Sequence, residues 1–363
     1  MDLVHTATNG LPDAPHISFA LPLREQDAQN LDDRIYGPFE SRLLVKAAEG
    51  CGMASDEILR DSQVRPEQLR DPAARVSARQ RLTVYRNIHE GCGDPTIFLR
   101  AGNAATVCSF GIWGYALLSS NSYLDAIHIA FKYLRVTGPL LEKTFDVENG
   151  MAMFEGRDRL VLGPLLQPVV DFWFAFSVRI SKEITQNAFA PERIELSFRE
   201  PLHGKAYEEL FECPVFFGAN RNRICFGVDN LTIALPRADT LSFQICEELC
   251  ATMLKEMKMA TGPAREVRDL ILRTPSDFPS LPAVAACLYT TPRTLRRKLA
   301  EQGTSYQQIL NDVRKSLAIK FLRETQLSME EIAERVGFSD SRNFRQAFKK
   351  WTDTTPSSHR ARL

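Results

Sequence analysis

In the last quarter of the chain, apolar positions recur at the spacing of short amphipathic helices, and the same order of helices occurs twice. The second occurrence has these apolar positions: Ile332, Ala333, Val336, Phe344 and Phe348. Ser328 and Glu331 have the spacing of a capping box, which predicts where the first helix of this pair begins. Gly337 ends that helix, because glycine readily takes the left-handed backbone that closes a helix. Ser339 and Asp340 predict the cap of the second helix.

The second helix of this pair has a polar face opposite its two phenylalanines. At 100° per residue, four side chains fall within an arc of about 100°: Arg342, Arg345, Gln346 and Lys349. A helix that enters the DNA major groove needs such guanidinium, amide and ammonium groups on one face. A solvated basic face over a packed aromatic face is also common, so this pair alone leaves both interpretations open.

The same pattern begins 48 residues upstream, where Ser280 predicts the cap of a short helix. Its apolar positions, which match those of the later helix, are Val284, Ala285 and Leu288. Thr291 then predicts the cap of a helix whose first residue is Pro292, which has no N–H to leave unpaired there. A shift of 49 residues superimposes the second helices: Arg293, Leu295, Arg296, Arg297 and Leu299 coincide with Arg342, Phe344, Arg345, Gln346 and Phe348. Two helix-turn-helix units of the same polarity indicate an internal duplication.

Between the two units, the pattern predicts one long helix. Gly303 ends the helix before it, and Thr304 with Gln307 has the spacing of a capping box. An apolar stripe then recurs at spacings of four, three, four and four: Tyr306, Leu310, Val313, Leu317 and Phe321. A helix over residues 304–324 is about 30 Å long, close to one turn of B-DNA at about 34 Å. We therefore predict that it places two recognition helices in successive major grooves on one face of the duplex.

The preceding part of the chain has a mixed pattern. From residue 36 to residue 140 the apolar spacing is mostly helical, and beyond Leu141 the period changes to two. Asn149-Gly150 lies between two alternating segments, which predicts a β-hairpin. Three further segments have the pattern of short strands: residues 192–199, 213–218 and 222–227. The expected fold is an α+β domain followed by an all-α domain with two helix-turn-helix motifs joined by a linker helix.

Residues 238–259 predict a helix that closes the α+β body. Its apolar positions repeat every four residues, and such a stripe is either core or the seam of a dimer. These positions are Leu241, Ile245, Leu249 and Met253. A Thr-Gly-Pro sequence then breaks the helix, and three prolines follow within residues 274–282. The domain ranges that result are 1–30 as a mostly disordered segment, 31–260 as the α+β domain, 261–276 as a linker and 277–363 as the helical domain.

The formal charge of the chain is zero, but the charge is unevenly spread. Residues 261–363 have a balance of +7, and residues 1–260 have a balance of −7. A basic module on an acidic body suits binding of a polyanion by the basic part alone.

No membrane, metal or cofactor is expected as a partner. The most apolar segment, residues 160–180, is interrupted by two prolines and Asp171, so it predicts a buried helix rather than a membrane span. The first 15 residues lack the basic start and apolar run of a secretory signal, which predicts a cytoplasmic location. The eight cysteines are scattered without metal-ligand spacing and are interpreted as small buried apolar groups.

Residues 277–363 resemble the DNA-binding domain of the AraC/XylS transcription regulators. The resemblance is carried by residues 332–360, IAERVGFSDSRNFRQAFKKWTDTTPSSHR, and by residues 291–299, TPRTLRRKL. The chain departs from the family at Tyr289, where the first turn usually has glycine, so a tighter or shifted turn is expected there.

The resemblance implies a DNA-binding role for ten residues. Base readers would be Arg293, Thr294 and Arg297 in the first recognition helix, and Arg342, Asn343 and Gln346 in the second. Phosphate contacts would be Arg296, Arg345 and Lys349, and Ser341 completes the set. A solvated side chain is the alternative at each of these edge positions.

The N-terminal body resembles the arabinose-binding-like sensor domain of one branch of that family. The similar segments are residues 119–141 and 211–239. This resemblance implies that residues 31–260 sense an effector, and that a late helix pairs two copies of the chain into a homodimer. Six aromatic residues either line a pocket for a mostly apolar organic molecule or form plain core: Trp113, Tyr115, Phe172, Trp173, Phe174 and Phe176.

The leading hypothesis is a sequence-specific transcription regulator. It would activate a metabolic or catabolic operon, with double-stranded DNA, a small organic effector and RNA polymerase as partners. One alternative is a ligand-independent regulator whose N-terminal domain only oligomerises. Another is a DNA-modifying enzyme with a targeting module, such as an adaptive-response methyltransferase, but no nucleophile motif or glycine-rich phosphate loop supports it.

Overall fold

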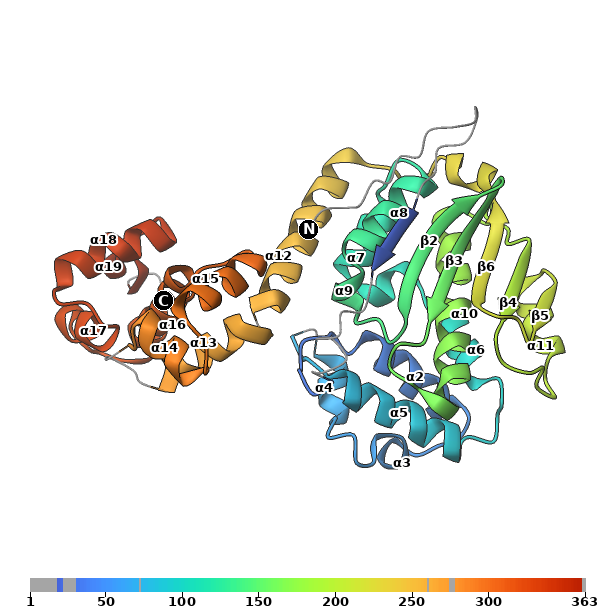
Figure 1. Cartoon of the computed structure of the whole chain (residues 1–363), viewed down its shortest axis with the longest axis horizontal. Helices are drawn as coiled ribbons and strands as arrows, with labels where there is room; N and C mark the ends of the chain where they lie inside the picture. Colours follow the sequence, from blue (N-terminus) through green and yellow to red (C-terminus); the bar gives the residue numbers. More distant parts are fainter. Residues whose placement is uncertain (1–17, 22–30, 72, 260, 274–277, 361–363) are drawn as a thin grey trace. The chain divides into compact units, whose positions relative to one another are not determined.

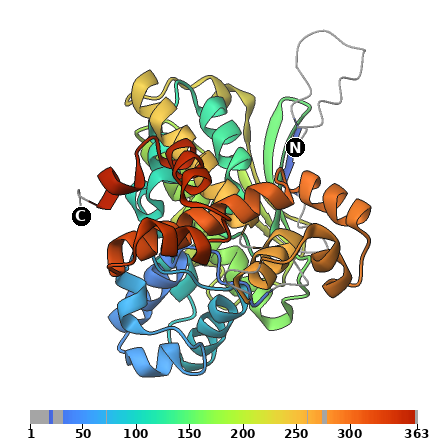
Figure 2. The ribbon, with the colours of Figure 1, turned by 90° about the vertical axis from the view of Figure 1, so that its left-hand side faces the viewer.

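The structure, a computed structural model, describes residues 18–21, 31–71, 73–259, 261–273 and 278–360. The chain forms two compact units that divide between Leu254 and Lys255. The first unit contains a β-sheet with helices around it, and the described part of the second contains helices alone (Figures 1 and 2). This arrangement confirms the predicted α+β domain followed by an all-α domain.

A six-stranded sheet forms the centre of the first unit, with the strand order β1-β2-β3-β6-β4-β5. Its strands are β1 (Ser18–Leu21), β2 (Glu142–Glu148), β3 (Met151–Arg157), β4 (Arg193–Leu196), β5 (Val215–Phe217) and β6 (Asn222–Gly227). β4 and β5 pair in parallel, and the other neighbours pair antiparallel. The predicted hairpin is confirmed, because Asn149 and Gly150 have positive φ angles of 52° and 74° between β2 and β3.

β1 lies within the segment 1–30, for which the sequence predicts mostly disorder. It pairs with β2, and its Phe19 is buried with a ring centroid 5.8 Å from that of Phe145. Four residues are too few for a periodic signal, so the pattern missed this strand. Residues 1–17 and 22–30 lie outside the described residues.

Helices surround this sheet in the first unit. They are α2 (Phe39–Gly50), α3 (Ser55–Leu59), α4 (Pro66–Arg70), α5 (Ala78–Gly91), α6 (Ile97–Asn103), α7 (Ile112–Leu118), α8 (Tyr123–Lys132), α9 (Leu134–Thr137), α10 (Leu166–Ile184), α11 (Lys205–Phe211) and α12 (Thr240–Met259), the last of which continues past Leu254 into the second unit. The most apolar segment forms α10, most of whose side chains are buried, as predicted. Among the helices described, none is both long and apolar enough to cross a membrane.

One face of the sheet is covered by α8 and α10. Alternation along the hairpin places Lys143, Phe154 and Gly156 on this face. Phe131 of α8 stacks on Phe154, with ring centroids 6.1 Å apart. Trp173 of α10 lies so close to Gly156 that a Cβ there would approach its ring to 2.7 Å. This packing brings a lysine of β2 against the side chains of a buried helix.

The second unit is built on two small hydrophobic clusters. Its helices are α13 (Gly262–Arg273), α14 (Leu281–Cys287), α15 (Pro292–Glu301), α16 (Tyr306–Glu324), α17 (Met329–Arg335), α18 (Ser341–Thr352) and α19 (Pro356–Arg360). One cluster joins α13, α14 and α15 to the first half of α16, and the other joins α17 and α18 to its second half. Leu317 of α16 packs against both clusters, so this helix connects the two helix-turn-helix units.

Helix α13 occupies most of the range 261–276, which the sequence analysis assigned to a linker. Its buried Ala264, Val267 and Ile271 belong to the first cluster, and it packs along α16. Their spacing of three and four residues is a helical signal, which the assignment of this range to a linker overlooked. α13 is therefore part of the core of the second unit. Residues 274–277, which contain part of the proline-rich segment, lie outside the described residues.

Candidate nucleic-acid interface

The second helix-turn-helix unit consists of α17, a short turn and α18. The predicted capping box is present: the Glu331 N–H donates to Ser328 Oγ at 3.2 Å, and the Ser328 N–H donates to Glu331 Oε2 at 2.7 Å. Gly337 closes α17 with a φ of 74°. Asp340 caps α18, because its Oδ1 accepts from the Asn343 N–H at 2.7 Å. Local sequence signals therefore position this recognition helix.

The exposed face of α18 carries the residues that the sequence analysis selected. Phe344 and Phe348 are fully buried on the opposite side. The exposed members are Arg342, Asn343, Arg345, Gln346 and Lys349, and Ser341 is half-buried. Asn343 Nδ2 donates to Asp340 Oδ2 at 2.6 Å, and Arg345 lies 3.6 Å from the Glu330 carboxylate. These two side chains would have to exchange intramolecular partners for a contact to DNA.

The first helix-turn-helix unit, α14 and α15, has the same construction. The hydroxyls of Ser280 and Thr291 accept hydrogen bonds from the first turns of the two helices, as predicted. Leu295 and Leu299 are buried, and the basic side chains of α15 are exposed: Arg293, Arg296 and Arg297. Thr294 is half-buried and receives a hydrogen bond from the Thr291 hydroxyl at 3.0 Å. Arg297 Nη1 lies 2.5 Å from Glu301 one turn along the helix.

The turn between α14 and α15, in the first helix-turn-helix unit, is not shifted, contrary to the expectation drawn from Tyr289. Tyr289 has a φ of 49° and stands at the position of Gly337, 48 residues earlier. Its N–H donates to Ala286 O at 3.1 Å, and the Gly337 N–H donates to Glu334 O at 2.9 Å in the same way. The tyrosine therefore adopts the left-handed backbone that glycine adopts in the second unit, and its side chain is 99% exposed.

The linker helix α16 begins two residues later than predicted. Ser305 caps it in place of Thr304, because Ser305 Oγ accepts from the Gln308 N–H at 3.2 Å. Thr304 is buried, and Gln307 Nε2 donates to Asn311 Oδ1 at 3.1 Å instead of closing a capping box. Two adjacent hydroxyl residues offer the same local signal, and burial of Thr304 decides between them. The helix has 19 residues and so a length of about 28 Å.

Arg314 of α16 connects the two helix-turn-helix units, and the sequence pattern did not predict this role. Its guanidinium lies 5.4 Å from the ring centroid of Phe278 and 4.8 Å from that of Phe338. Its Nη2 also donates to the carbonyl of Gly337 at 2.9 Å. Burial lowers the pKa of this arginine from its ordinary value. An arginine between two aromatic rings thus connects the turn of the second helix-turn-helix unit to the segment that precedes the first helix-turn-helix unit.

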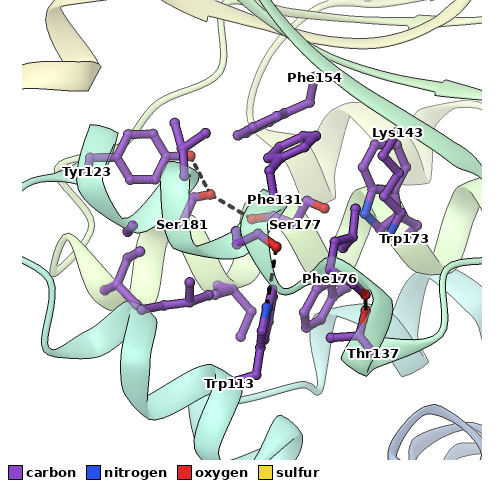
Figure 3. Close-up of a pocket in the computed structure, with 17 residues that line it drawn as sticks. Trp113, Tyr123, Phe131, Thr137, Lys143, Phe154, Trp173, Phe176, Ser177 and Ser181 are labelled. Atoms are coloured by element: carbon purple, nitrogen blue, oxygen red, sulfur yellow. Dashed lines mark hydrogen bonds between the residues drawn. The ribbon is translucent and has the colours of Figure 1, made fainter. Parts of the chain in front are cut away.

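The first of the two compact units, which contains the β-sheet, has a cavity beside the covered face of that sheet (Figure 3). Of the six aromatic residues selected from the sequence, Trp113, Trp173 and Phe176 line it. Phe172 lines a neighbouring smaller cavity, Phe174 is buried in the core, and Tyr115 is exposed. Lys143 also lines the cavity and was not selected, although it stands in phase with the buried Phe145 along β2.

The apolar stripe of α12 faces outward in the single chain. Leu241, Ile245 and Leu249 are 66%, 49% and 43% exposed, whereas Cys246 and Cys250 on the other side are buried. Burial raises the pKa of Cys250 to about 12, which is the opposite of an activated thiol. All eight cysteines are free. In the part of the chain that the structure describes, no group of three or more His, Cys, Asp or Glu side chains has the arrangement of a metal site.

Comparisons with known proteins cover both units. Residues 52–235 match a family described as the N-terminal arabinose-binding domain of AraC transcription regulators, and residues 284–362 match a helix-turn-helix domain. The ornithine utilization regulator of Pseudomonas aeruginosa is 34% identical over 309 residues, which are 85% of this chain and 91% of that protein. The urease operon transcriptional activator of Escherichia coli is 38% identical over 94 residues, 26% of this chain and 32% of that protein. The crystal structure of the regulator CdpR from Pseudomonas aeruginosa covers 89% of this chain and 98% of its own, with 23% identity and a TM-score of 0.46.

Proposed function

Because the chain belongs to the AraC family of transcription regulators, we propose that it reads promoter DNA with α15 and α18 under the control of a small organic effector bound by its first unit. The observation that carries the DNA part is the exposed basic and amide face of α18 over a fully buried pair of phenylalanines. That face has its counterpart on α15. The two faces belong to units joined by a helix of about 28 Å, close to one DNA turn of about 34 Å.

Ten of the exposed or half-buried residues of α15 and α18 take one of two roles in this proposal. Base edges are read by Arg293, Thr294, Arg297, Arg342, Asn343 and Gln346. Phosphates are held by Arg296, Arg345 and Lys349, with Ser341 at the start of α18. Arginine and asparagine or glutamine pair in two-point contacts with guanine and adenine, whereas a lysine beside the backbone contributes charge without sequence information.

The proposed output is activation of a metabolic or catabolic operon through contact with RNA polymerase. Support comes from the relatives, one of which is named for ornithine utilization and another as the activator of a urease operon. A chromosomal promoter as target puts the proposed site of action in the cytoplasm. We propose that residues 31–260 sense the effector and that residues 277–363 bind DNA, with α13 of the segment 261–276 packed into the core of the DNA-binding unit.

We further propose that the chain acts as a homodimer through α12. Three large apolar side chains at successive turns, Leu241, Ile245 and Leu249, face outward from this helix. A row of apolar residues at this spacing is what a helix–helix seam requires. A second copy of the chain, placed with its α12 against this row, would remove all three side chains from water.

A gel-shift assay with the full chain and DNA from its own promoter region tests the DNA part of the proposal. We expect binding to one segment that is lost when competitor of the same sequence is added, and that weakens steeply as salt rises, because phosphate contacts release counterions. Binding that is equally strong to every sequence, or that does not respond to salt, would contradict the proposal. Methyl transfer to a cysteine of the chain from alkylated DNA would instead favour the enzyme alternative.

A further inference from the structure

The cavity of the first unit lies between α7, α8, α10 and the covered face of β2 and β3 (Figure 3). Its empty volume is about 620 Å³, which includes space open to solvent. Small-molecule sites typically have volumes of about 300–1,000 Å³, so the cavity is large enough for a small organic ligand.

Most of the cavity wall is aromatic or aliphatic. Its large apolar members are Trp113, Ile127, Phe131, Trp173, Phe176 and Ile180. The polar group on one side is already satisfied, because the hydroxyls of Tyr123 and Ser181 are 2.6 Å apart and Ser181 donates to the carbonyl of Ser177 at 2.8 Å. This wall therefore favours an apolar ligand body.

Lys143 lines the opposite side of the cavity, beside Trp173 (Figure 3). Its side chain comes from β2, and the residue is only 8% exposed. Among the described residues that line the cavity, it is the one charged side chain. Its Nζ lies 4.4 Å from the ring centroid of Trp173, and no described carboxylate forms an ion pair with it. A cation–π contact returns about 2 kcal/mol when desolvated, which is less than the several kcal/mol that burial of an ammonium group costs.

The nearby charged groups do not provide a counter-ion for Lys143. Glu40 and Arg81 are the charged residues that act on Lys143, and Glu40 forms an ion pair with the buried Arg81. When Lys143 is protonated, two cations and one carboxylate give this buried group a net charge of +1. Buried charges in proteins are paired or neutralised, so a negative group that binds beside Lys143 would stabilise its charged form.

We propose that this cavity is the effector site and that its ligand is a small organic carboxylate, whose carboxylate group pairs with Lys143 while its apolar body fills the aromatic part. The assignment rests on the proposed effector-sensing function and adds the ligand class and the residue that selects it. A carboxylate at Lys143 would balance the surplus charge, and the apolar body would remove water from the tryptophan-lined wall.

Binding of an acid should change the protonation of Lys143, because the surroundings of this residue shift its pKa. Burial lowers the pKa of its ammonium group to about 7, while Glu40 raises it and Arg81 lowers it. A carboxylate placed beside the amine favours the charged form, so binding raises that pKa again. Above pH 7 the protein therefore takes up protons when it binds an acid, and it takes up none when it binds a neutral analogue.

Isothermal titration calorimetry of the full chain at pH 7.5, in buffers of different ionisation enthalpy, tests this assignment. The probes are benzoate, phenylacetate and octanoate, each compared with its own amide. At least one acid is expected to bind about tenfold or more tightly than its amide and to do so with proton uptake. Quenching of Trp113 and Trp173 fluorescence would report the site. In Lys143→Met, the preference for the acid should disappear while the amide binds as well as before, and the control Lys46→Met, at an exposed lysine of α2, should keep the preference.

Each remaining result overturns the carboxylate assignment. These are failure of all three acids to bind the wild-type chain at millimolar concentration, binding of acid and amide within about threefold, and an unchanged preference in Lys143→Met. The comparison of acid with amide uses the wild-type chain, so it stands even if the variant does not fold. The proposed regulator function fails separately, because only loss of sequence-specific promoter binding in the gel shift would contradict it.

Discussion

Tyr289 and Gly337 occupy the same position in the two helix-turn-helix units and have the same left-handed backbone, with φ angles of 49° and 74°. The duplicated fold thus imposes one turn geometry on two different residues. Glycine adopts this conformation freely, whereas a residue with a Cβ is strained there by roughly 1–2 kcal/mol. The tyrosine side chain is exposed, so burial does not offset the strain.

We expect Tyr289→Gly to stabilise the first helix-turn-helix unit by about 1 kcal/mol, because it relieves backbone strain without removing a buried contact. Hydrogen exchange of the α14 and α15 amides should slow by about fivefold. The matched change is Gly337→Ala, which should destabilise the second unit, since its Cβ would lie 2.7 Å from the ring of Phe278 at a positive φ. Faster exchange in Tyr289→Gly would show that the tyrosine has a stabilising contact.

The sequence signals whose predictions the structure confirms are all local. Ser328 with Glu331, and Asp340 before α18, act within one turn of their own helix, so spacing alone predicts them. Phe344 and Phe348 recur at helical spacing, and both are buried. The same local reasoning could not choose between Thr304 and Ser305, because tertiary burial makes that choice.

The features that the sequence did not predict depend on partners far away in the sequence. Arg314 resembles any polar residue of a helix, and only the fold brings Phe278 and Phe338 to its two sides. Lys143 had a usable signal, because it alternates in phase with the apolar and buried Phe145 and Val147 along β2. A lysine in that phase is a buried lysine, and a buried lysine without a carboxylate indicates a site.

Replacement of Arg342 by alanine should relax specificity at one base position of the operator. Loss of a two-point contact to a base costs about 1–3 kcal/mol at that position and little elsewhere. Gel shifts with single-base operator variants measure this, with Lys349→Ala for comparison. The lysine change should weaken binding to all sequences alike and reduce the salt dependence by about one ion. An equal loss across all sequences in Arg342→Ala would assign the arginine to a phosphate. The same comparison applies to Arg297 of α15.

Replacement of Phe348 by alanine should unfold the second helix-turn-helix unit. Truncation of a fully buried aromatic side chain costs about 3–5 kcal/mol, and this small cluster has few other large residues to compensate. Limited proteolysis should then cut within residues 325–360 and leave the first unit intact, whereas the exposed neighbour Lys350→Ala should remain resistant. A protease-resistant Phe348→Ala would mean that the cluster collapses around the cavity.

A charge in the α12 stripe should separate the proposed dimer. Ile245→Glu places a carboxylate in the middle of the apolar row, so pairing would bury an unpaired charge. Sedimentation velocity should show a dimer for the wild-type chain and a monomer for this variant. Gln244→Glu introduces the same charge at an exposed polar position of α12 and should leave the dimer intact. A monomeric wild-type chain at every concentration would refute the seam.

Removal of Lys143 should stabilise the empty protein, and the gain should depend on pH in a definite direction. The pKa of this amine is about 7 in the folded chain and about 10.5 when unfolded, so between these values the unfolded chain binds more protons. In that range the wild-type chain gains stability as pH rises, by about 1.4 kcal/mol per pH unit, and below pH 7 it bears the full cost of the buried charge. Lys143→Met lacks this cost, so its advantage in urea denaturation should be largest near pH 6 and shrink towards pH 10. A saturating acid that binds at Lys143 should narrow this advantage at pH 6, because the ligand binds the wild-type chain more tightly than the variant and so stabilises it more. If the stability advantage of Lys143→Met were the same at every pH, burial would not lower the pKa of Lys143.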